Sequence, residues 1–199
     1  MKSVISILLL LNAAFASAAQ PVLGENTAAA VIDRGLQAEP LMWLPFPLPY
    51  EIEQSSSSKD AKLLSALFDH GLVTREKQMR MEDMPDSAQT RKKLLLLWRY
   101  DYPQAQSAET PEGFYYGHGR LKHIVELSSP YLIGSYYYAE AYIQWYVDDM
   151  QDWITDPAFR IARTLRRSAE SYSRPFEKRV YLQFDGNHWA LWKGQPGML

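Results

Sequence analysis

The sequence predicts an α+β fold in which a short, winged-helix-like helical unit precedes an antiparallel β-sheet with one packed helix. Apolar residues recur at helical spacing in residues 59–70, whereas residues 131–149 alternate in the manner of a half-buried strand. A third signal is the Asp185-Gly186 pair between two alternating segments, which is typical of a β-hairpin.

The first 18 residues have the features of a secretory signal peptide. Lys2 provides positive charge, residues 4–11 form an apolar segment, and two cleavage frames of small residues end at Ala18 and Ala19. The apolar segment is shorter than the roughly 20 residues that a membrane-spanning helix needs, and no second long one follows. We therefore expect a periplasmic or secreted bacterial protein without a stable membrane span.

Composition limits the chemistry of the mature chain. The absence of Cys excludes disulfides, thiolate metal ligands and thiol catalysis. Removal of Lys2 lowers the 21 basic residues to 20, against 23 acidic residues, which gives a formal charge near −3. This mildly acidic balance lacks the basic surface of a general nucleic-acid-binding protein, so we expect no nucleic acid among its partners.

Residues 19–58 are expected to form a Pro/Ser-rich extended arm. Four prolines lie between Pro40 and Pro49, where fixed φ angles and missing N–H donors favour an extended chain over a helix. We expect this arm to lie along the domain surface and to bury Trp43 and Phe46. The alternative is that it is a docking motif for another protein.

The globular domain, residues 59–199, is expected to begin with two helices. Ser58 is a suitable N-cap for the first helix, over residues 59–70. Gly71 suits the left-handed position just after its last turn. A second short helix is expected over residues 74–81.

Two strands and their connections follow these helices. The Leu-rich run at 94–98 predicts a strand buried on both faces, with a short helix as the alternative, and residues 104–112 predict a polar loop. Residues 114–126 predict a strand with a bulge or bend at 117–119, where His118 lies between two glycines. A turn is expected at 128–130.

Residues 131–149 predict one long strand with two distinct faces. By composition the core face consists of Ser135, Tyr137, Ala139, Ala141, Ile143, Trp145 and Val147. After this strand, Asp156-Pro157 predicts the start of a helix that runs to about Ser171, with Asp as its cap and Pro at its first position.

The tyrosines of this strand are the candidate binding residues. Six of the 13 tyrosines lie between Tyr131 and Tyr146, and tyrosine offers rigid contact area with a hydrogen-bonding tip. Together with Trp43 and Phe46 of the arm, the candidate contact residues are Tyr136, Tyr138, Glu140, Tyr142, Gln144 and Tyr146. The alternative is structural, because cross-strand aromatic pairs stabilise sheets and the helix over 156–171 could cover this face.

Catalytic and metal-binding patterns are weak in this chain. His118, His123 and His188 lack the spacing of a zinc motif, so ordinary polar histidines are favoured over a zinc site, and we expect no cofactor. Asp148, Asp149 and Asp152 follow the long strand, where acidic residues commonly form turns and caps. Acid/base chemistry there, as in glycoside hydrolysis, is the alternative.

Several segments, taken in order, resemble a broad group of small exported bacterial proteins. In that group a winged-helix-like start precedes an antiparallel-sheet half with a W-x-x-D-P helix entry, here Trp153 to Pro157. The resemblance spans roughly residues 60–192 and implies fold and compartment, but it carries no catalytic residue over. The matching segments are LLSALFDHGLVTRE, LLLLWRYDYP, GFYYGHGRLKHIVEL, GSYYYAEAYIQWYVDDMQDW and DGNHWAL.

These observations favour a non-catalytic periplasmic binding or accessory protein that contacts a protein or envelope partner through a tyrosine-rich sheet face. One alternative is an envelope glycan or peptidoglycan hydrolase that uses Glu140, Asp148 or Asp149. Another is an immunity protein that blocks a toxin in the periplasm.

Overall fold

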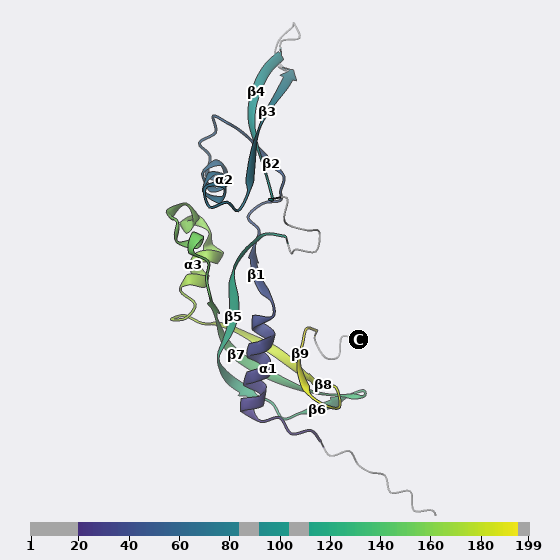
Figure 1. Cartoon of the computed structure of the whole chain (residues 1–199). Coiled ribbons are helices and arrows are strands. Elements are labelled where there is room, and N and C mark those ends of the chain that lie inside the picture. Colours follow the sequence, from purple (N-terminus) through teal and green to yellow (C-terminus); the bar gives the residue numbers. More distant parts are fainter. Residues whose placement is uncertain (1–19, 84–91, 104–111, 195–199) are drawn as a thin grey trace, which may run out of the picture.

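The computed structural model describes residues 20–83, 92–103 and 112–194. It confirms the predicted α+β class, with two antiparallel sheets arranged along the length of an elongated molecule (Figure 1). The expected signal peptide and nearly all of the expected loop over 104–112 lie outside the described residues. No helix within the described residues is both long and apolar enough to cross a membrane.

The larger sheet has six strands in the order β1-β5-β7-β8-β9, with β6 paired to β7. The expected strand over 131–149 divides at Gly134 and Ser135, which form a turn between β6 and β7. The predicted C-terminal hairpin is present as β8 and β9. The strands of this sheet are β1 (Pro40–Trp43), β5 (Phe114–Leu127), β6 (Tyr131–Ile133), β7 (Tyr136–Asp148), β8 (Phe176–Phe184) and β9 (Trp189–Trp192).

One face of this sheet is covered by α1 (Glu25–Gln37), which the sequence did not predict. Residues 25–37 therefore differ from the expected extended arm. The buried residues of α1 pack on the side chains that were predicted as the core face of β7. The contact is close, because a Cβ atom at Gly35 would lie 2.4 Å from Leu191 Cδ2. The buried residues of this core are Ala28, Ile32, Leu36, Ala139, Ala141, Ile143, Val180, Leu182 and Trp189.

The smaller sheet has three strands in the order β2-β4-β3 and carries α2 (Lys59–Asp69). As predicted, the Ser58 hydroxyl caps α2 by accepting from the Ala61 amide at 3.1 Å, and Gly71 has a φ of 69° after its end. The expected second helix is instead a strand, because residues 74–83 pair with β4 over ten positions. The strands are β2 (Tyr50–Glu53), β3 (Thr74–Asp83) and β4 (Lys92–Asp101).

Burial in β4 alternates, so the expectation of a strand buried on both faces was wrong. Leu95 and Leu97 are buried, whereas Leu94 and Leu96 are 53% and 48% exposed. The reason is that Leu94 and Leu96 lie farther out on the face of Trp98 and Tyr100, beyond the core that these two residues form with α2.

A second core joins the two sheets. Trp43 at the end of β1 packs against Phe114, Trp153 and Phe159, with ring centroids 5.8–6.3 Å apart. The same core contains Leu63, Leu64 and Leu67 of α2. Here the chain runs through two short 3₁₀ helices, η1 (Asp152–Thr155) and η2 (Pro157–Ile161), and then α3 (Arg163–Ala169).

The helix predicted from Asp156 starts as expected but is not continuous. The Asp156 carboxylate accepts from the Ala158 amide at 2.8 Å, which confirms the cap. Ala162 has a ψ of 100°, which breaks the helix into η2 and α3. His70 Nε2 lies 3.1 Å from Asp156 Oδ2, so this cap also connects η2 with the end of α2.

Candidate binding surface

The face of the six-stranded sheet opposite α1 carries most of the predicted contact residues. Alternate side chains of β7 lie on it beside alternate side chains of β8, because Tyr142 pairs with Arg179 and Gln144 with Glu177. The α1 helix packs on the opposite face, against Ala139, Ala141 and Ile143 of β7. We call this surface the tyrosine face; its residues are Tyr138, Glu140, Tyr142, Gln144 and Tyr146 of β7 with Glu177, Arg179, Tyr181 and Gln183 of β8.

Hydrogen bonds hold the centre of the tyrosine face in one arrangement. The Tyr142 hydroxyl donates to Glu177 Oε2 at 2.6 Å, and Gln144 Nε2 donates to Glu177 Oε1 at 2.7 Å. These two bonds lower the pKa of Glu177, and the bond to Glu177 raises the pKa of Tyr142. The carboxylate therefore stays ionised and the phenol stays neutral around neutral pH.

An ion pair flanks this centre. Arg179 donates to the Glu140 carboxylate, and its guanidinium carbon lies 5.5 Å from the centroid of the Tyr142 ring. Hydrogen bonding to Glu140 raises the pKa of Arg179. The surface thus alternates aromatic rings with paired charges, an arrangement that offers both apolar area and hydrogen-bonding groups to a ligand.

The predicted contact residues differ in their exposure. Tyr136 is 48% exposed, whereas Tyr138 is only 3% exposed and accepts a hydrogen bond from Gln183 at 2.9 Å. Trp43 is 9% exposed and lies in the core between the sheets. Phe46 is partly buried against the same core. Trp43 and Tyr138 therefore present little side-chain surface to a partner.

The helix that was offered as a cover for the tyrosine face does not lie over it. The α3 helix packs near the end of β7, where the Val147 amide donates to Ser171 Oγ at 2.9 Å. Tyr172, just beyond α3, does reach the face, where its ring meets Tyr146 edge-on with centroids 5.1 Å apart. Among the described residues, no helix packs over the centre of the face, which consists of side chains of the sheet itself.

Sequence reasoning missed the residues that β8 and the end of α3 contribute. Glu177, Arg179 and Tyr181 alternate with buried Val180 and Leu182, so period-two alternation could have placed them on one face. Their position opposite β7 depends on the register between β7 and β8, which cannot be predicted from local alternation. Tyr172 carried no signal of its own.

Glu140 and Asp148, two carboxylates of the alternative hydrolase site, lie far apart. Glu140 and Asp148 lie eight residues apart on β7, about 26 Å along an extended strand. Paired glycosidase carboxylates lie within about 10 Å. Glu140 is paired with Arg179, and Asp148 Oδ2 lies 3.3 Å from Arg120. Asp149 lies in a bend directly after β7, with a φ of 50°.

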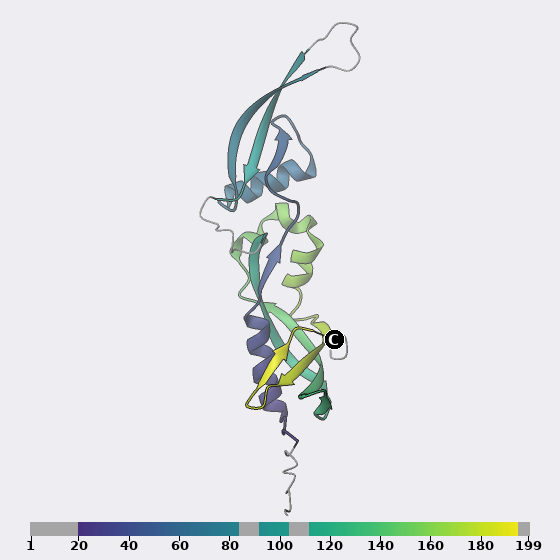
Figure 2. The ribbon, with the colours of Figure 1, turned by 90° about the vertical axis from the view of Figure 1, so that its right-hand side faces the viewer.

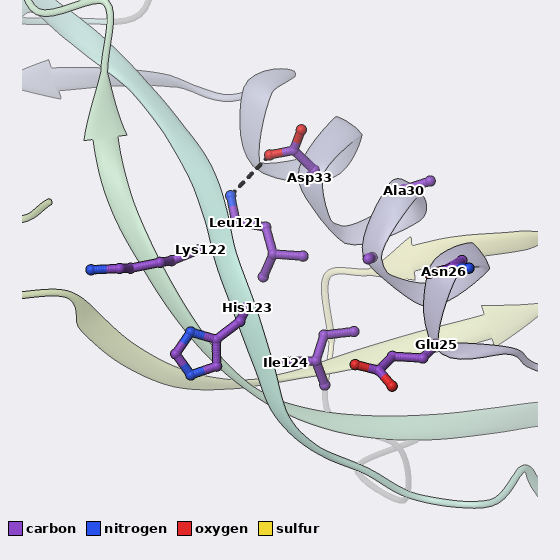
Figure 3. A pocket seen from close by; sticks show the side chains of 9 residues that line it. Glu25, Asn26, Ala30, Asp33, Leu121, Lys122, His123 and Ile124 are labelled. Atoms are coloured by element: carbon purple, nitrogen blue, oxygen red, sulfur yellow. Dashed lines mark hydrogen bonds between the residues drawn. The ribbon is translucent and has the colours of Figure 1, made fainter.

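A shallow cavity of about 380 Å³ lies between α1 and β5 (Figure 3). Asp33 accepts from the Leu121 amide at 2.9 Å and from Arg120 Nε at 3.0 Å, so its carboxylate attaches α1 to β5. Figure 3 shows Lys122 and His123 directed away from α1. The polar groups of the cavity therefore do not converge, and no group of three potential metal ligands occurs in the described part of the chain.

Searches with the sequence and the structure found no matching protein-family model, no matching curated protein and no matching solved structure.

Proposed function

We propose that this chain is an exported, non-catalytic binding or accessory protein that contacts a protein or envelope partner through the tyrosine face. The observation that carries the proposal is the pre-ordered network of Tyr142, Gln144 and Glu177 on a sheet face that no described helix covers. A surface whose side chains are already ordered loses little conformational entropy when it binds.

The composition of the face supports this role. Tyrosine buries a large area with few rotatable bonds and keeps a hydroxyl for hydrogen bonding, which explains its enrichment at interfaces. Tyr142 and Tyr146, both half-buried, supply such rings, while Glu140 and Arg179 supply paired charges at the edge of the aromatic area. The separation of Glu140 from Asp148 supports binding over hydrolysis as its task.

The experiment compares binding by the mature protein and by a double variant, Tyr142→Ala with Tyr146→Ala. The probes are purified peptidoglycan sacculi, tested by co-sedimentation, and a periplasmic extract of the source bacterium, tested by affinity capture. Ile161→Ala is the matched control, because Ile161 is 59% exposed and lies on η2, outside the tyrosine face.

We expect the wild type and Ile161→Ala to retain the same sacculi or the same extract protein, and the double variant to lose it. Loss of sacculi indicates an envelope partner, and loss of a protein indicates a protein partner. Urea unfolding of all three proteins shows whether the double variant is folded. A folded double variant that retains every ligand of the wild type contradicts the proposal.

A further inference from the structure

The β3–β4 hairpin extends well beyond the third strand of its sheet. β3 pairs with β4 from Lys92 to Asp101, whereas β2 pairs only from Leu97 to Tyr100. The outer half of the hairpin is therefore a two-stranded ribbon, and Figure 2 shows it projecting from the body of the molecule. A two-stranded ribbon has no second layer of its own to cover apolar side chains.

One face of this ribbon is apolar and exposed. Met79 pairs with Leu96 and Met81 with Leu94, so the four side chains lie together on one face. Their exposed fractions are 76%, 48%, 57% and 53% in that order. We call these four residues the hairpin face. Contiguous exposed apolar residues of this kind mark interaction sites in soluble proteins.

Charged and aromatic residues continue this face at both ends. Toward the base of the hairpin the next pair is Lys77 with Trp98, and Lys77 Nζ lies 5.6 Å from the centroid of the Trp98 ring. Toward the tip the next pair is Asp83 with Lys92. A cation and an aromatic ring thus stand at one end, and an anion and a cation stand at the other.

We propose that a second copy of this chain covers the hairpin face. The proposed two-fold axis lies between the two hairpins, runs perpendicular to their strands and passes over Arg80 and Leu95. Rotation about this axis packs the two hairpin faces against each other, with each strand antiparallel to its copy in the partner subunit. Residue 77 of one copy then lies opposite residue 83 of the other, because both are three positions from the axis. By the same relation, position 98 lies opposite position 92.

This symmetry places complementary groups opposite each other at every pair of positions. Lys77 faces Asp83 of the partner subunit as an ion pair, and Trp98 faces Lys92 of the partner subunit as a cation–π pair. Met79 faces Met81 of the partner subunit, and Leu94 faces Leu96 of the partner subunit. Self-complementarity of one patch about a two-fold axis is the requirement for an isologous dimer.

The first test is sedimentation equilibrium of the mature protein over a wide range of concentrations. We expect a reversible monomer–dimer equilibrium, which Leu96→Asp weakens by roughly 30-fold or more, the effect of losing a central contact. Leu132→Asp is the matched control, because Leu132 is 58% exposed on β6 and should leave the equilibrium unchanged. A wild type that is monomeric at every concentration overturns the proposal and leaves the hairpin face to a different protein.

The second test addresses the antiparallel register through Lys77 and Asp83. Lys77→Glu alone and Asp83→Lys alone each place like charges opposite each other, so each variant should dimerise more weakly than the wild type. A one-to-one mixture of the two variants should form heterodimers, because Glu at 77 then meets Lys at 83 and the native pair is kept at the second site. A mixture that associates no better than either variant alone overturns the proposed register. Both tests measure self-association only, so they stand apart from binding at the tyrosine face.

Discussion

Replacement of Ser171 by Ala should destabilise the protein by about 2 kcal/mol. The Ser171 hydroxyl is fully buried, accepts from the Val147 amide at 2.9 Å and donates to the Ser168 carbonyl at 2.5 Å. In the variant the Ser168 carbonyl keeps a bond from the Ser171 amide at 3.0 Å, but the buried Val147 amide loses its acceptor. An unpaired buried donor costs about 1–3 kcal/mol.

The assay for Ser171→Ala is urea unfolding, with Ser173→Ala as the matched control. Ser173 also donates from its hydroxyl to a carbonyl three residues earlier, at 3.0 Å, but it is exposed, so its removal should cost less than about 0.5 kcal/mol. With a slope of about 2 kcal/mol/M, Ser171→Ala should lower the urea midpoint by about 1 M at constant slope. The thermal midpoint should fall by about 4–8 °C. Equal midpoints for the two variants would refute the assigned role of Ser171.

Three further predictions concern packing and pH. Trp43→Ala should cost about 3–5 kcal/mol in urea unfolding because it empties the core between the sheets; an unchanged midpoint would instead indicate a surface docking residue. Gly35→Ala should lower stability by about 1 kcal/mol or more despite the better helix propensity of Ala, because its Cβ would overlap Leu191, and a raised urea midpoint would contradict that close contact. The pKa of Asp156 is lowered, first by the Ala158 amide and then by His70, so the stability it provides is present above its ordinary pKa of about 4 and is lost as pH falls through the lowered value. The stability difference between wild type and Asp156→Ala should therefore shrink from pH 6 to pH 3, and an equal difference at both values would rule out this linkage.

The elements that the sequence predicted well have local signals. Ser58 and Gly71 bound α2 by capping chemistry that acts within one turn. Ala139, Ala141 and Ile143 are fully buried because period-two alternation places them on one face of β7. In each case the residues that determine the structure are neighbours in the chain, so no knowledge of distant contacts is needed.

The elements that the sequence missed depend on partners that are distant in the chain. The buried positions of α1, such as Ala28 and Ile32, give a narrow stripe next to a glycine, and the helix packs on strands about 100 residues away. Residues 74–83 contain good helix formers such as Lys77 and Met79, but pairing with β4 overrides that propensity. Exposure on both sides of β3 also removed the alternation that would have indicated a strand.

The candidate site divides in the same way. Alternation predicted which residues of β7 share a face, but it could not separate Tyr138, which is buried beside Gln183 and Trp192, from Tyr142, which is only half-buried. That difference arises because Trp192 of β9 lies on this face opposite Tyr181, and its ring packs edge-on against Tyr138 with centroids 6.1 Å apart. The role of Glu177 required the β7–β8 register, because Glu177 lies on β8, opposite Gln144 and 33 residues away from it in the chain.

The two proposed surfaces lie at opposite ends of the molecule, and this arrangement has a functional consequence. The hairpin face is on the projecting ribbon, whereas the tyrosine face is on the sheet at the far end (Figure 1). A dimer formed through two hairpins would therefore leave both tyrosine faces free, one at each end. Such a dimer could engage two sites on a partner that repeats along a surface, such as the cell envelope. Once one tyrosine face is bound, binding of the second is intramolecular, which raises the overall affinity without any new kind of contact. If both proposals hold, Leu96→Asp should leave binding to a single isolated site unchanged and weaken only binding to a surface that presents many sites.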